Sequence, residues 1–153
     1  MKKILSVSQA STSIDIALLI ARVGIGALML THGLPKMAML FSGEPVQFPA
    51  MMGMSSVMSL GLAVLAEVFC SVLLITGLLT RLAVIPLIIT MLVALILVHA
   101  ADPIAKQEPA LHYLLVYAVL LFAGGGKYSL DYLLQGKRIA TNNARKTEPA
   151  FAV

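Results

Sequence analysis

The chain has 153 residues, of which 59% are hydrophobic and only 12% are charged, and its mean hydropathy is +0.96. A soluble domain carries about twice this charged fraction, so the composition excludes an ordinary soluble protein and indicates one integral membrane domain. The net charge of +4 does not indicate nucleic acid as a partner, because the basic residues flank the apolar segments. The single cysteine, Cys70, excludes an intrachain disulfide.

Four apolar segments are expected to form helices that cross the bilayer. The fourth apolar run, 111–122, has twelve residues and fits a buried segment as well as a span. The first should end at Pro35, since proline disfavours helix at the residue before it. Only Thr80 and Arg81 separate the second and third segments, which predicts an antiparallel helical hairpin. The fold class predicted is therefore all-α, an integral membrane four-helix bundle with up-down topology. The expected helices are about 14–34, 57–79, 82–98 and 111–126.

The lysines and arginines predict the orientation. With four crossings, eight basic residues share the side of both termini, and two lie on the other side. The positive-inside rule then places both termini in the cytoplasm of a multi-pass protein of the bacterial inner membrane. The chain divides into a cytoplasmic N-terminus (1–13), a membrane domain (14–134) and a flexible cytoplasmic tail (135–153). The eight are Lys2, Lys3, Arg81, Lys127, Lys137, Arg138, Arg145 and Lys146, and the two are Lys36 and Lys106.

Two charges lie deep inside apolar segments, Arg22 in the first and Glu67 in the second. A lone charge at such depth costs several kcal/mol unless it finds a partner or water. At 1.5 Å per residue, Arg22 lies roughly 12 Å from one surface and Glu67 roughly 15 Å from the other. These depths agree in a core about 30 Å thick, which predicts an intramembrane ion pair between Arg22 and Glu67. Such a pair either fixes helix register or forms a proton or redox site.

Further polar residues map to the side opposite the termini. Helical geometry places His32 and Lys36 on the face of Arg22, and Glu108 precedes His112 by one turn. This outward group would bind a ligand or exchange protons with a quinone, or else consist of histidines in contact with interfacial water. We expect an outward polar cluster of His32, Lys36, His99, Glu108 and His112.

The candidate catalytic residues are Glu67, His32 and Lys36. No HExxH or CxxC spacing predicts a metal site, and no motif for a dinucleotide, haem or other covalent cofactor is present. A diffusible quinone is therefore the candidate cofactor. Methionines in the 35–56 connection offer soft ligands for Cu(I), or flexible packing. The four tyrosines, Tyr113, Tyr117, Tyr128 and Tyr132, are expected to form a partial interfacial belt.

Three stretches carry a resemblance to the DoxX family of small four-helix membrane proteins. The resemblance covers about residues 16–134. The stretches read ARVGIGALMLTHGLPK (21–36), LAEVFCSVLLITGLLTRLA (65–83) and GGGKYSLD (124–131). The family often has a proline where this chain has Gly125. The signature positions that the resemblance implies are Arg22, His32, Gly33, Lys36, Glu67, Arg81 and Asp131.

The resemblance implies membrane redox work, since related proteins include a subunit of a thiosulfate:quinone oxidoreductase. The leading interpretation is an oxidoreductase subunit linked to the quinone pool, with the bilayer, a partner redox protein and further copies of the chain as candidate partners. A second interpretation is a non-catalytic helper that assembles or anchors a partner protein. A third is a pathway for a small molecule or a metal.

Overall fold

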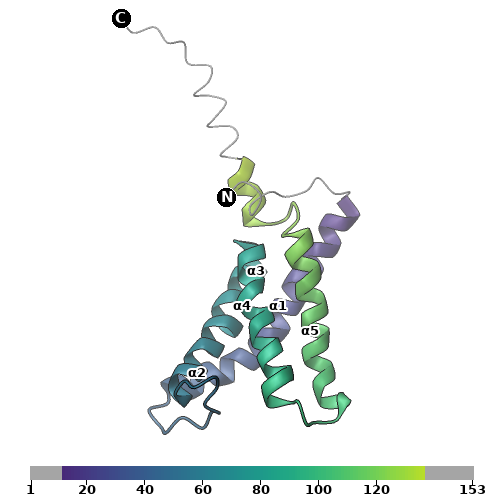
Figure 1. The fold of residues 1–153 in the computed structure, drawn as a ribbon. Coiled ribbons are helices and arrows are strands. Elements are labelled where there is room, and N and C mark those ends of the chain that lie inside the picture. Colours follow the sequence, from purple (N-terminus) through teal and green to yellow (C-terminus); the bar gives the residue numbers. More distant parts are fainter. Residues whose placement is uncertain (1–11, 137–153) are drawn as a thin grey trace, which may run out of the picture.

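The computed structural model describes residues 12–136, and every regular element within that range is a helix. Within this range the elements join end to end into four long rods, whose arrangement is shown in Figure 1. The second and third rods each contain a π-helical stretch, labelled η, and a short helix over 130–136 follows the fourth rod. The elements are α1 (Thr12–Phe41), α2 (Ser56–Val64), η1 (Leu65–Cys70), α3 (Ser71–Thr76), α4 (Thr80–Val93), η2 (Ala94–Val98) and α5 (Ile104–Ala123).

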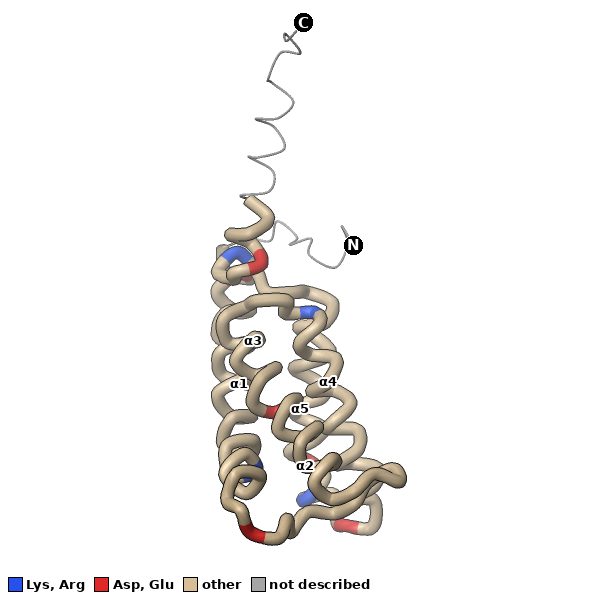
Figure 2. The backbone as a smooth tube through the Cα atoms, turned by 90° about the vertical axis from the view of Figure 1, so that its left-hand side faces the viewer, with Lys and Arg blue, Asp and Glu red and all other residues tan. Residues whose placement is uncertain are grey.

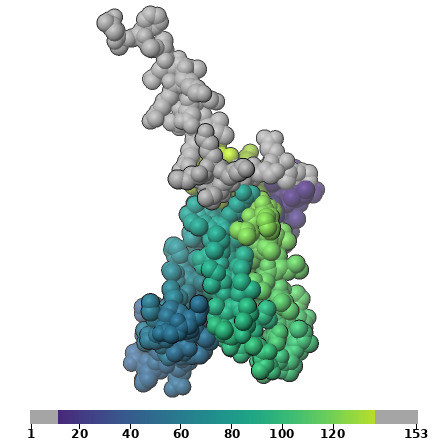
Figure 3. Space-filling view, viewed as in Figure 1, coloured from purple at the N-terminus to yellow at the C-terminus, as the bar shows by residue number. Residues whose placement is uncertain are grey.

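The rods pack lengthwise around one apolar core. α1 lies against α2, η1 and α3, while α4 lies against η1 and α5. The core lies between α1, α3, α4 and α5, with Met29, Leu74, Leu87 and Leu120 fully enclosed. The start of α1 and the 124–136 segment lie at one end of the rods, and the loops that follow α1 and η2 lie at the other (Figure 1). The space-filling view shows the same elongated body (Figure 3).

Two glycines set the close antiparallel contact between α1 and the second rod. A Cβ on Gly33 would lie 3.0 Å from Glu67 Cβ, and one on Gly26 would lie 3.3 Å from the Ser71 carbonyl oxygen. Small residues let helix backbones approach closely. The nearest side chains are those of Val68 for Gly33 and Ile75 for Gly26, so moving seven residues back along α1 moves the contact seven residues, about two turns, forward along the second rod. This register determines which polar side chains meet.

The helix bounds differ from those expected in three places. α1 does not end before Pro35 but continues to Phe41, and the contact of Lys36 with Glu67 holds these last turns against the second rod. α5 begins at Ile104, because its first two turns are polar and hydropathy alone does not detect them. The hairpin turn lies at 77–79, ahead of Thr80, because Gly77 adopts a left-handed conformation (φ 70°) that ends α3.

Three of the described helices are long and apolar enough to cross a membrane: Thr12–Phe41, Ser56–Thr76 and Thr80–Val98. Large apolar side chains cover their outer faces, as a lipid environment requires. Charged positions gather toward the two ends of the rods (Figure 2). The expected tails, 1–13 and 135–153, lie almost entirely outside the described residues.

Candidate functional site

Glu67 lies within the π-helical stretch η1 and is only 1% exposed. One carboxylate oxygen, Oε1, accepts a hydrogen bond from Lys36 Nζ on α1, and the two side chains form an ion pair. A π-helical turn widens the helix locally and is frequent at functional sites. The Lys36 side chain is 30% exposed, so the pair joins a buried carboxylate to the surface of the bundle.

Aromatic side chains surround this pair. The His32 ring packs edge-on against Tyr113 of α5, with 5.8 Å between ring centroids, and Tyr113 lies 5.9 Å from Tyr117. Both tyrosines lie within electrostatic range of Glu67. Phe48, in the loop after α1, lies with its ring centroid 5.9 Å from Lys36 Nζ, a cation–π distance. We call Glu67, Lys36, His32, Tyr113 and Tyr117 the Glu67 site.

Three buried polar atoms near Glu67 have no hydrogen-bond partner in the described structure. They are Glu67 Oε2, Ser71 Oγ and the Tyr117 hydroxyl. Nearly all buried polar atoms in proteins are satisfied by protein groups or ordered water, and those that are not often mark functional positions. The Glu67 site therefore combines a charge pair, two aromatic surfaces and unused hydrogen-bonding capacity. Such a set of groups can bind a small ligand and exchange its protons.

The expected ion pair between Arg22 and Glu67 is wrong, since Glu67 pairs with Lys36. The register places Gly33 opposite Glu67, and Arg22 lies eleven residues earlier, roughly 16 Å away along α1. The two depths were counted from opposite surfaces, whereas α1 begins at Thr12 and runs for 30 residues. The 30 residues of α1 are about 45 Å long, against a core about 30 Å thick, so depths counted from its two ends leave roughly 15 Å between Arg22 and Glu67.

Arg22 instead belongs to a second buried cluster at the opposite end of the rods. Its Nη2 donates a hydrogen bond of 2.7 Å to the Tyr128 carbonyl oxygen. Its guanidinium fills the space beside Gly77, where a Cβ would collide with Nη1. Asp131 lies close enough to interact with the Arg22 charge. We call Arg22, Gly77, Tyr128 and Asp131 the Arg22 closure.

Asp131 holds the hairpin turn within this closure. Its Oδ1 accepts from the Leu79 amide at 2.7 Å and its Oδ2 from the Thr80 amide at 3.0 Å. A carboxylate at a helix N-terminus satisfies free amides and complements the helix dipole. Beside it, the fully buried Asp15 accepts from the Lys127 amide at 3.0 Å. The GGGKYSLD stretch thus closes one end of the bundle through hydrogen bonds with Asp15, Arg22 and the hairpin turn.

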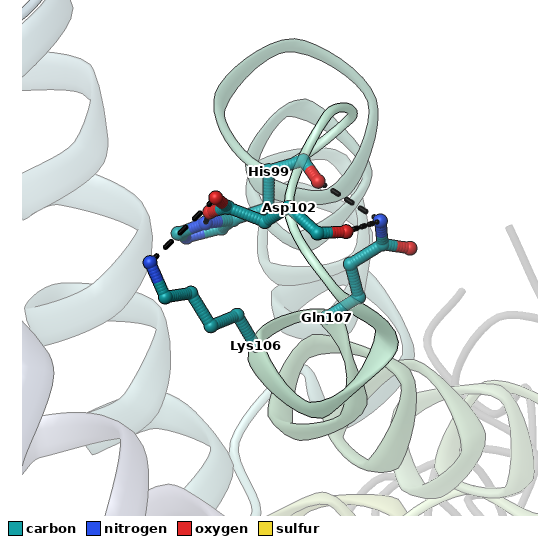
Figure 4. A network of polar contacts seen from close by, with 4 residues as sticks. All are labelled: His99, Asp102, Lys106 and Gln107. Atoms are coloured by element: carbon teal, nitrogen blue, oxygen red, sulfur yellow. Dashed lines mark hydrogen bonds and ion pairs between the residues drawn. The ribbon is translucent and has the colours of Figure 1, made fainter.

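The outward histidines do not form one cluster. His99 Nδ1 donates to Asp102 at 2.7 Å, and Gln107 donates to the carbonyl oxygens of His99 and Asp102 (Figure 4). This network ties the loop between η2 and α5. The His99 hydrogen bond is the main reason that the pKa of Asp102 lies below its usual value, and Lys106 at 3.6 Å adds to the effect. As expected, Glu108 and His112 share a face of α5, and 3.9 Å separates Glu108 Oε1 from His112 Nε2.

The sequence interpretation missed several residues of the Glu67 site. Tyr113 and Tyr117 were assigned to an interfacial belt, yet they are 8% and 0% exposed. Two tyrosines one turn apart in an apolar helix were the signal, because they place two hydroxyls on one face. Ser71 shares a helix face with Glu67 by sequence spacing alone, whereas Phe48 carried no comparable signal. Among residues 12–136, no three His, Cys, Asp or Glu side chains gather as a metal site.

Comparison with known proteins identifies the family of the chain. The DoxX family model matches residues 17–100, more than half of the chain and both residues of the Lys36–Glu67 pair. No curated protein and no solved structure matches the chain. The family match and the three long apolar helices identify a multi-pass membrane protein. The chain belongs to the DoxX family.

Proposed function

We propose that this protein is an oxidoreductase subunit of the bacterial inner membrane that binds a quinone headgroup at the Glu67 site. Its four rods would cross the bilayer up and down, with both termini in the cytoplasm. Arg81 and Lys127 would then lie on the cytoplasmic side with the Arg22 closure, in accord with the positive-inside rule. The Glu67 site would open toward the other side, through the exposed part of Lys36.

The observation that carries this proposal is that only one of the two carboxylate oxygens of Glu67 has a hydrogen-bond partner. It is 1% exposed, it binds Lys36 through one oxygen, and its other oxygen has no partner. A purely structural ion pair would be expected to satisfy both oxygens, because an unsatisfied buried acceptor costs about 1–3 kcal/mol. The free oxygen supports a role beyond packing.

Each candidate catalytic residue has a role that its position supports. Lys36 would donate a hydrogen bond to a headgroup oxygen while it still neutralises Glu67. Glu67 would take up or return a proton, and His32, packed on Tyr113, would exchange protons with water near the mouth of the site. Electron transfer would require a donor from the partner redox protein or from solution.

Comparison of two histidine variants tests this function. His32→Ala removes a group of the site without stranding a buried charge, and His112→Ala removes an exposed histidine of α5 that is paired only with Glu108. In membranes from a deletion strain, wild-type protein and His112→Ala should restore quinone-linked activity, and His32→Ala should not. Lys36→Ala is unsuitable, since it leaves Glu67 unpaired.

Quinone retention gives a second measurement. Wild-type protein purified in mild detergent should retain quinone in organic extracts, and His32→Ala should retain less. If His32→Ala complements the deletion fully and neither protein retains quinone, the redox function is refuted. A partner protein purified in fixed ratio without a cofactor would then support the assembly-helper interpretation.

Topology is tested separately. An alkaline phosphatase fusion after Val153 should be inactive, and a green fluorescent protein fusion at the same position should be fluorescent. The opposite pattern would overturn the orientation and place the Glu67 site on the cytoplasmic side.

A further inference from the structure

Two residues with unpartnered buried hydroxyls, Ser71 and Tyr117, each lie one helical turn beyond a residue of the Glu67 site. Ser71 follows Glu67 by four residues, about one turn, on the same side of the rod. Tyr117 follows Tyr113 by four residues on α5, which runs in the same direction as the second rod (Figure 1). Ser71 and Tyr117 thus both lie one turn deeper than the level of Glu67 and Tyr113. Both are 0% exposed.

Side-chain direction brings these groups together. A helical side chain leans toward the N-terminus of its own helix. The Tyr117 ring therefore leans toward Tyr113, which it contacts, and so toward the level of Glu67. Lys36 leans back along α1 toward Glu67, in agreement with the ion pair. Lys36 occupies Oε1, so Oε2 is the buried carboxylate oxygen that is left to accept a hydrogen bond.

The free atoms have a definite chemical preference. A carboxylate oxygen can only accept a hydrogen bond, whereas the Ser71 and Tyr117 hydroxyls can both donate and accept. Of the described helices that pack against η1, α1 already supplies Lys36 to Oε1, and α4 has Arg81 as its one charged residue, at its far end. A ligand that presents a hydroxyl can donate to Glu67 Oε2. A ligand that presents a carbonyl oxygen there would face a second acceptor and be repelled.

We propose that Glu67 Oε2, supported by the hydroxyls of Tyr117 and Ser71, receives a hydroxyl group, so that the site binds a quinol more tightly than the matching quinone. This inference rests on the proposed function and names the redox form that its site prefers. Tighter binding of the reduced form makes the bound quinone a stronger oxidant, by about 30 mV for each tenfold in affinity. Glu67 and Tyr117 thereby set the redox preference of the site.

Paired binding measurements test this preference. A benzoquinone with a short isoprenoid chain and its hydroquinone are titrated anaerobically into wild-type protein in lipid nanodiscs by calorimetry. The quinol should bind roughly ten- to hundred-fold more tightly, the range for a hydrogen bond to a charged group. Glu67→Gln replaces the free acceptor by an amide that can donate, so its preference should reverse toward the quinone.

Two tyrosine variants provide matched controls. Tyr117→Phe keeps the buried ring and removes the hydroxyl, so the quinol preference should fall several-fold. Tyr128→Phe removes a hydroxyl from a side chain that is 51% exposed in the 124–131 segment, and should leave the preference unchanged. If Glu67→Gln fails to fold, the comparison of Tyr117→Phe with Tyr128→Phe still tests the quinol preference.

The outcomes separate the two proposals. Equal affinity for quinol and quinone in the wild type refutes the redox preference and leaves quinone binding standing. Binding of neither form refutes the proposed function, and this inference with it. A Tyr117→Phe variant with the full preference of Tyr128→Phe would show that the buried hydroxyl has no part in the site.

Discussion

The pairing of Lys36 with Glu67 predicts an unequal response to removal of its two members. Lys36→Ala strands a carboxylate that is 1% exposed, so it should cost about 3–5 kcal/mol of folding free energy. Glu67→Ala strands an ammonium that is 30% exposed and reaches water, so it should cost less. The double variant should be milder than the sum, with a coupling energy of about 1–3 kcal/mol.

Arg22 supplies the control for this cycle. Coulomb energy falls as the inverse of distance, and Arg22 lies roughly 16 Å along α1 from the position opposite Glu67, against roughly 3–4 Å for a contact pair. The Arg22–Glu67 coupling should therefore be at most about a quarter of the Lys36–Glu67 coupling.

Both cycles can be measured on purified protein in mixed micelles, by circular dichroism during titration with dodecyl sulfate. The free energy of unfolding is obtained for the wild type, each single variant and each double variant. An additive Lys36–Glu67 cycle, or an Arg22–Glu67 coupling of equal size, would refute the register derived from the glycine contacts.

Three further predictions follow from the two ends of the bundle. Gly77→Ala should lower the melting temperature, because the new Cβ would collide with the buried Arg22 guanidinium at a position of positive φ. Gly24→Ala should not lower it, since a Cβ there has no atom within 4 Å. Equal melting temperatures of the two variants would contradict the Arg22 closure. Asp131→Ala should cost about 1–3 kcal/mol by freeing the first amides of α4, measured by the same unfolding titration, and Asp131→Asn should recover part of the loss. His99→Asn should raise the pKa of Asp102 toward its usual value, as measured by carboxyl-carbon NMR. Because the folded pKa of Asp102 is depressed, its stabilisation of the fold is complete above the unfolded pKa and is lost as pH falls through the folded pKa. An unchanged Asp102 titration would exclude the hydrogen bond from His99.

The amino-acid sequence alone predicted the membrane class and the positions of the three helices long and apolar enough to cross a membrane. Apolar runs of 17 residues or more leave few alternatives, because a backbone in lipid must satisfy its own hydrogen bonds. The sequence also indicated Glu67 as exceptional, since it is the one charge in its apolar segment. Helix ends were less accurate. The Lys36–Glu67 contact holds α1 beyond Pro35, and α5 begins at Ile104 in polar turns that hydropathy does not detect.

The partner of Glu67 was decided by the tertiary structure. Arg22 and Lys36 are both cations on one side of α1, and their spacing in the sequence does not say which of them faces Glu67. The closest approach of the backbones at Gly26 and Gly33 selects Lys36 and sends Arg22 to the opposite end. In the same way, Tyr117 becomes part of the site only when α5 packs across the bundle. The local sequence determines which charged residues lie within the membrane, whereas the register between helices determines which residues they contact.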